Sequence, residues 1–82
     1  MTSVPASEWL KHSRKRLRLT QSDVAAFLTI QLRRPINQAR IAEIESGDFS
    51  ISTDMVLLLT SFFRKVEVLR RNGMVWQDIF PH

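Results

Sequence analysis

The sequence contains no cysteine, and it has only two glycines, three prolines and two histidines. Without cysteine the chain cannot form disulfides, thiolate zinc sites or a cysteine nucleophile, which fits a reducing cytoplasm. With two glycines in all, it has no glycine-rich phosphate loop. Neither His12 nor His82 has partners at metal-ligand spacing or a Ser/Asp constellation beside it. The sequence therefore predicts no enzyme, no metal and no cofactor.

Long apolar runs are absent as well. The longest, residues 55–59, is far below the roughly 18 residues that a membrane span needs. The first 16 residues contain no apolar run of signal-peptide length. We therefore expect a soluble, cytoplasmic protein with no membrane partner.

The positive charge is concentrated in the first half of the chain. Residues 1–40 carry eight Lys and Arg against two acidic residues, whereas residues 41–82 carry four against six. A basic half joined to a slightly acidic half favours a face that binds a polyanion, with a different role for the rest. From charge alone, a solvated basic helix explains the pattern equally well.

Helical periodicity predicts an all-α fold, a compact domain of four to five helices with no strands. We expect a single domain over residues 1–82, with a helical core over residues 6–72 and a hydrophobic C-terminal tail over residues 73–82. In a first helix over residues 6–17, apolar side chains such as Leu10 fall on one narrow face. A domain this small buries only about 60–65% of its unfolded surface, so dimerisation often adds to its stability.

Two further helices have clear starting signals. Thr20 and Asp23 have capping-box spacing, so a second helix begins after Thr20. Residues 29–36 are not periodic and contain a proline, which predicts a loop. Asn37 is a good N-cap for a third helix, and Gly47 is a natural stop for it.

A fourth helix follows, with Ser52 or Thr53 as its N-cap. Apolar residues recur at helical spacing through the whole segment. The helix either runs unbroken to Asn72, with Gly73 ending it, or kinks near Arg64. The sequence is compatible with both.

Residues 19–28, LTQSDVAAFL, followed by residues 36–47, INQARIAEIESG, resemble the phage-repressor family of helix-turn-helix DNA-binding domains. This is the Cro and lambda-repressor type, also called the xenobiotic-response-element (XRE) family. The likeness covers about residues 10–65 and implies a lambda-repressor-like fold. Family members join the two motif helices by a tight turn with a glycine, whereas this chain has Thr29 and a longer turn. That spacing resembles the POU-specific domain, so we expect a POU-like arrangement of the two helices.

The resemblance implies DNA-binding roles for residues of both motif helices and the turn between them. Gln21 is expected to anchor the phosphate backbone and to support Gln38, whose amide matches an adenine edge in the major groove. Two arginines in the turn are expected to contact phosphates. The alternative for each is a solvated surface side chain. The predicted set is Gln21, Arg33, Arg34, Asn37, Gln38, Ala39, Arg40 and Glu43.

Three of these residues follow Gln38 on the third helix. Ala39 is placed to touch a thymine methyl, and Arg40 suits a guanine or a phosphate. Glu43 has two possible roles, since its carboxylate either accepts from a cytosine amine or tethers Arg40. The POU pattern has a basic residue at the position of Glu43, so that role does not carry over.

The resemblance also implies a structural ion pair. In the family, an arginine at the position of Arg14 pairs with a glutamate at the position of Glu45. The helical angle places Glu45 near the buried side of its helix, where a lone carboxylate would be costly. We therefore expect an Arg14–Glu45 pair that does not contact DNA.

These features together predict a sequence-specific transcriptional regulator, such as a repressor from a bacterium, phage or mobile element. Its partner is double-stranded DNA, a two-fold operator that it binds as a homodimer, and no small-molecule ligand is expected. The alternative is a protein-interaction module of the same fold, such as an antitoxin or antiactivator. Trp76 either joins the dimer interface or folds back on its own domain. The predicted interface consists of Phe62, Val66, Leu69, Trp76 and Phe80.

Overall fold

The computed structural model describes residues 5–76. Within this range the chain forms four helices and no strand. They are α1 (Ala6–Arg16), α2 (Gln21–Leu32), α3 (Gln38–Ser46) and α4 (Thr53–Arg71). The all-α fold is therefore confirmed, and the described range contains four helices. None of these helices is long and apolar enough to cross a membrane.

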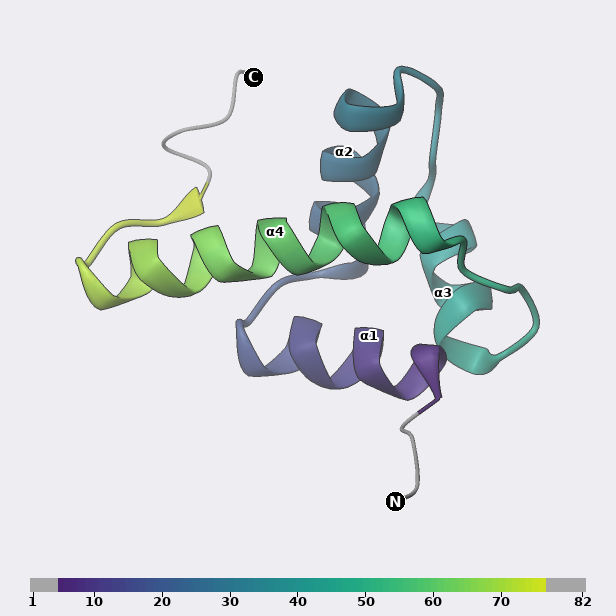
Figure 1. Cartoon of the computed structure of the whole chain (residues 1–82), viewed down its shortest axis with the longest axis horizontal. Helices are drawn as coiled ribbons and strands as arrows, with labels where there is room; N and C mark the ends of the chain where they lie inside the picture. Colours follow the sequence, from purple (N-terminus) through teal and green to yellow (C-terminus); the bar gives the residue numbers. More distant parts are fainter. Residues whose placement is uncertain (1–4, 77–82) are drawn as a thin grey trace.

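The longest helix, α4, spans the domain, with α2 on one side of it and α1 on the other (Figure 1). The short helix α3 lies at the end where α4 begins (Figure 1). It packs against both α1 and α2, and α2 in turn packs against α4. Helix α3 is therefore held by contacts with both of the first two helices.

Side-chain caps begin three of the helices. At α2, the Thr20 hydroxyl accepts from the backbone N–H of Asp23 at 3.0 Å, and the Asp23 carboxylate accepts from the backbone N–H of Thr20 at 2.8 Å. Asn37 and Ser52 each accept from the backbone N–H three residues further on, at 2.9 and 3.2 Å. The predicted capping box and the Asn37 cap are confirmed, and Ser52 is the cap of α4.

The prediction of a loop over residues 29–36 was wrong for its first half. Residues 29–32 form the last turn of α2, and the connection to α3 is limited to residues 33–37. The physical reason is Leu32, whose side chain packs against the core. This contact stabilises one more turn of the helix. Periodicity did not show it, because one apolar side chain defines no stripe.

Two local features shape the connection between α2 and α3. The Thr29 hydroxyl donates to the carbonyl of Ile36 and accepts from its backbone N–H, both at 2.9 Å. Arg33 ends α2 in the left-handed region, with φ at +53°. A side chain of α2 therefore fixes where the chain re-enters α3.

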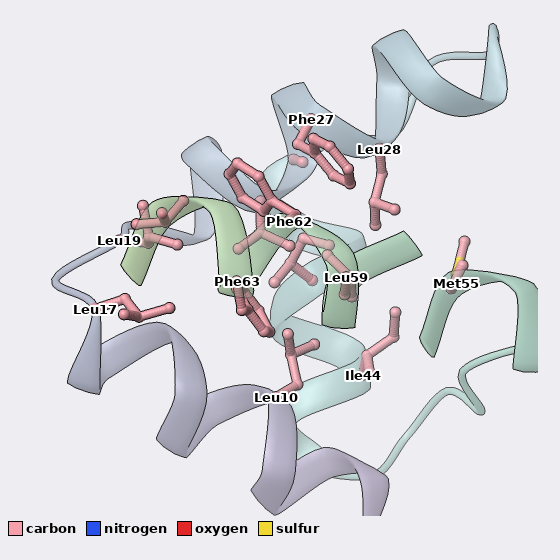
Figure 2. Packing of buried hydrophobic residues seen from close by; sticks show 14 residues of the cluster. Leu10, Leu17, Leu19, Phe27, Leu28, Ile44, Met55, Leu59, Phe62 and Phe63 are labelled. Carbon is pink, nitrogen blue, oxygen red and sulfur yellow. The ribbon is translucent and has the colours of Figure 1, made fainter. Parts of the chain in front are cut away.

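The core draws side chains from all four helices and from the turn between α1 and α2 (Figure 2). At its centre the rings of Phe27 and Phe62 stack with centroids 4.1 Å apart and planes 9° from parallel (Figure 2). The buried hydrophobic residues are Leu10, Leu17, Leu19, Val24, Ala25, Phe27, Leu28, Ile41, Ile44, Met55, Leu59, Phe62, Phe63 and Val66.

The predicted dimer interface needs correction, because two of its residues belong to this core. Phe62 and Val66 are 1% and 2% exposed, so they have no surface to offer a second copy. Trp76 folds back on its own domain, with its ring edge-on to Phe62 at 5.6 Å between centroids. Leu69 stays half-buried, and Phe80 lies outside the described residues. The apolar stripe of α4 packs inside the domain, where it covers apolar side chains of both α1 and α2.

Helix α4 is continuous from Thr53 to Arg71, with no break at Arg64. It ends as the sequence predicts, with Gly73 in the left-handed region at φ +73°. The backbone N–H of Met74 donates to the carbonyl of Leu69 at 2.9 Å and closes the last turn.

Candidate nucleic-acid interface

Arg14 of α1 and Glu45 of α3 form a two-pronged ion pair. The Arg14 Nε donates to Glu45 Oε2 at 2.7 Å, and Nη2 donates to Oε1 at 3.0 Å. The remaining Nη1 donates to the backbone carbonyl of Leu19, just before α2, at 3.0 Å. The two side chains are only 12% and 4% exposed. The predicted structural pair is confirmed, and it also ties down the turn that leads into α2.

The ionisation of Glu45 reflects two opposing effects. Burial alone raises the pKa of the carboxyl, but hydrogen bonds from Arg14 and Gln21, together with the charges of Arg14 and Lys11, outweigh it. The net result holds the pKa of Glu45 below its ordinary value of 4.5. The hydrogen bond to Glu45 likewise raises the pKa of Arg14 against the effect of burial. Both groups are therefore charged at neutral pH.

Gln21 extends this pair towards the surface. Its Nε2 donates to Glu45 Oε1 at 3.2 Å. An ionised carboxylate can only accept, so the Gln21 amide must turn its nitrogen inward and its oxygen outward. That oxygen accepts from the Nε2 of Gln38 at 2.6 Å. The charge of Glu45 therefore sets the direction of two successive amides, and the second belongs to an exposed residue at the start of α3.

Seven of the eight residues predicted to bind DNA line two hollows on the surface, and Arg33 lines neither. Gln21 and Gln38 line one of about 480 Å³, beside Thr20 and Ser22. The other, of about 320 Å³, runs along the opposite flank of α3 and is bordered by Pro35. Its lining includes five of the predicted residues, Arg34, Asn37, Ala39, Arg40 and Glu43.

Arg40 and Glu43 face each other on that second flank. Arg40 Nη1 lies 3.8 Å from Glu43 Oε2. Of the two roles considered for Glu43, contact with a cytosine amine or tethering of Arg40, this arrangement corresponds to the second. The Arg40 guanidinium also lies over the ring of Phe49, 3.8 Å from its centroid. Phe49 was not predicted, because it lies in a non-periodic stretch nine residues beyond Arg40.

Three of the predicted residues lie in the connection before α3. The Asn37 side-chain oxygen is engaged in capping α3. Arg33 and Arg34 are exposed, and within residues 5–76 neither forms an ion pair. Both cations are thus available to an external anion.

No family model, curated protein or solved structure matches this chain.

Replacing Arg14 by Met should lower the free energy of unfolding by about 3 kcal/mol, because it leaves Glu45 charged and buried without its partner. Urea unfolding monitored by circular dichroism measures the change. Arg16→Met is the matched control, because Arg16 pairs with Glu67 at 3.6 Å while both side chains are well exposed. The control should cost less than about 1 kcal/mol. Equal losses in the two variants would contradict the assignment.

The same pair should make stability depend on acidity. The pKa of Glu45 is lowered in the folded chain, so its contribution is complete above the ordinary value of 4.5 and is lost as the pH falls through the lowered value. Unfolding curves between about pH 3 and pH 7 should show this loss. Glu45→Gln should be less stable at neutral pH and should lack that part of the acid dependence. A variant curve parallel to that of the original chain would refute the linkage.

Proposed function

We propose that this protein is a sequence-specific DNA-binding regulator that reads the major groove with the amino-terminal end of α3. The observation that carries the proposal is the exposed Gln38 amide, which is oriented through Gln21 by the buried Arg14–Glu45 pair. A solvated surface glutamine is ordinarily free to rotate, whereas the Gln38 amide is held by a chain of hydrogen bonds that leads to a buried ion pair. An amide held in one orientation is suited to recognising a planar edge that presents one donor and one acceptor.

Adenine presents that edge. Gln38 gives one N–H to Gln21, which leaves its second N–H and its oxygen. The oxygen accepts from the adenine N6 amine, and the N–H donates to N7, as in the bidentate pairing of glutamine with adenine. Ala39 follows on the exposed face, where its methyl group suits the thymine methyl of a neighbouring base pair.

Cationic side chains around α3 suit the phosphate backbone. Arg33 and Arg34 are exposed and without ion pairs in the described residues, directly before the reading end of α3. Phosphate contacts of this kind position a protein on the duplex, and base contacts then select the sequence. The basic balance of residues 1–40 supports the same assignment.

We further propose that the regulator acts as a homodimer, because two half-sites give a small module the affinity that one lacks. With Phe62 and Val66 in the core, the surface that supports this proposal is the end of α4 and the residues after it. Val68, Met74 and Val75 are 52%, 42% and 53% exposed there.

Light scattering after size exclusion should give twice the mass of one chain at tens of micromolar. Val68→Glu should shift the protein to monomer, because it places a charge in the apolar contact. Leu57→Glu should remain dimeric, because Leu57 is 64% exposed but lies near the other end of α4. A monomeric parent protein would refute the homodimer.

The base-reading role is tested with duplexes that the protein itself enriches from a random pool. Gln38→Ala should bind the enriched duplex roughly 10- to 100-fold more weakly by fluorescence anisotropy. The salt dependence should not change, because no charge is lost. Gln31→Ala is the matched control, an exposed glutamine on α2. Failure to enrich any sequence, with a protein partner co-purifying instead, would favour the interaction module.

Arg33 offers a test that separates affinity from stability. Glycine relieves its left-handed backbone, so Arg33→Gly should unfold at the same or a slightly higher urea concentration. The loss of one phosphate contact should weaken DNA binding and reduce the slope of log affinity against log salt by about 0.9. Arg18→Gly makes the same change in charge and backbone at φ +57° and is the matched control for the effect on stability. An unchanged slope in Arg33→Gly would remove Arg33 from the interface.

A further inference from the structure

We infer that Phe49 is a specificity-determining positioning residue. It holds the guanidinium of Arg40 at the flank of α3 away from Gln38, so that Arg40 is withheld from the bases and the reading is left to Gln38 and Ala39. This inference rests on the proposed DNA-binding function.

The backbone after α3 is folded to bring Phe49 to Arg40. Gly47 takes a left-handed conformation, with φ at +86°, and turns the chain back. The backbone N–H groups of Asp48 and Phe49 then both donate to the carbonyl of Glu43, at 2.9 and 3.2 Å. These bonds place Phe49 beside the preceding turn of α3. The ring therefore reaches Arg40 because the chain reverses, not because the two residues are close in sequence.

Arg40 is restrained from two directions. The Phe49 ring lies on one side of it, 3.8 Å from the guanidinium carbon to the ring centroid. The Glu43 carboxylate lies 3.8 Å from Nη1. Glu43 thus takes part twice, since its carbonyl holds the Phe49 backbone and its carboxylate faces the Arg40 cation. The cation has an aromatic and an ionic partner within its own domain, although its side chain is 38% exposed.

The position of Arg40 on the helix makes this restraint matter for recognition. Successive residues of a helix are separated by about 100°, so Gln38 and Arg40 lie on opposite flanks, with Ala39 between them. Gln38 is hydrogen-bonded to Gln21 of α2, whereas Arg40 contacts the ring of Phe49 in the segment that follows α3. A freed Arg40 is long enough to turn towards guanine or phosphate, for which its guanidinium is well suited. Holding it back keeps the reading surface to one amide and one methyl group.

The test replaces the ring but keeps an apolar side chain. Phe49→Leu should bind the enriched duplex and mismatched duplexes about two- to fivefold more tightly, the range of a surface cation–π contact. The slope of log affinity against log salt should steepen by about 0.9, and the ratio of specific to non-specific affinity should fall. Phe49→Trp keeps an aromatic face and should behave as the original chain. Adding Arg40→Gln to Phe49→Leu should cancel the gain.

A measurement without DNA separates this inference from the function on which it rests. The side-chain protons of Arg40 should show an upfield ring-current shift in the NMR spectrum, and Phe49→Leu should abolish it. Absence of that shift in the original chain would overturn the inference whatever the DNA data show. An unchanged salt slope in Phe49→Leu, with specific binding by the original chain, would overturn it alone. Absence of any enriched sequence would overturn the proposed function, and this inference with it.

Discussion

The Arg14–Glu45 ion pair is the charged link between α1, α3 and the turn before α2, elements that also pack together in the hydrophobic core. Helices α1 and α3 have 11 and nine residues, lengths at which an isolated helix is marginal in water. Arg14 reaches from α1 to the Glu45 carboxylate on α3 and to the carbonyl of Leu19 before α2. Because Glu45 is almost fully buried, its charge is tolerable only with this partner in place. One pair thus adds a polar connection between α1, α3 and the start of α2 to the packing of the core.

The pair also determines how two amide side chains nearer the surface are oriented. A carboxylate cannot donate, so its charge decides which way the Gln21 amide points, and Gln21 decides the same for Gln38. The opposite flank of α3 is held by weaker means, an exposed ring and an exposed carboxylate around Arg40. The Gln38 flank is tied by hydrogen bonds to a buried charge. The other can be altered by changing a surface side chain, with little cost to the fold.

Local signals made much of the fold predictable. Thr20, Asp23 and Asn37 mark helix starts because capping needs only residues close in sequence. The apolar stripes of the helices marked most of the core in the same way. The Arg14–Glu45 pair was predicted from the resemblance to the phage-repressor family, because no spacing rule links residues 31 positions apart.

The errors arose where contacts between distant residues decide the outcome. Helix α2 runs one turn further than its apolar periodicity predicts, because the Leu32 side chain packs against the core. Phe62 was assigned to a dimer, because an apolar stripe does not reveal whether its partner is another helix of the same chain. Phe49 went unnoticed, because its contact with Arg40 exists only after the chain reverses at Gly47.

The most direct test of the account is a double-mutant cycle between Glu45 and Gln38, read out as affinity for the enriched duplex. Glu45→Gln should weaken binding in the original chain but should have almost no further effect once Gln38 is alanine. The coupling should be at least about 1 kcal/mol. Additive effects, within about 0.3–0.5 kcal/mol, would show that the buried charge does not orient the reading amide and would contradict the account.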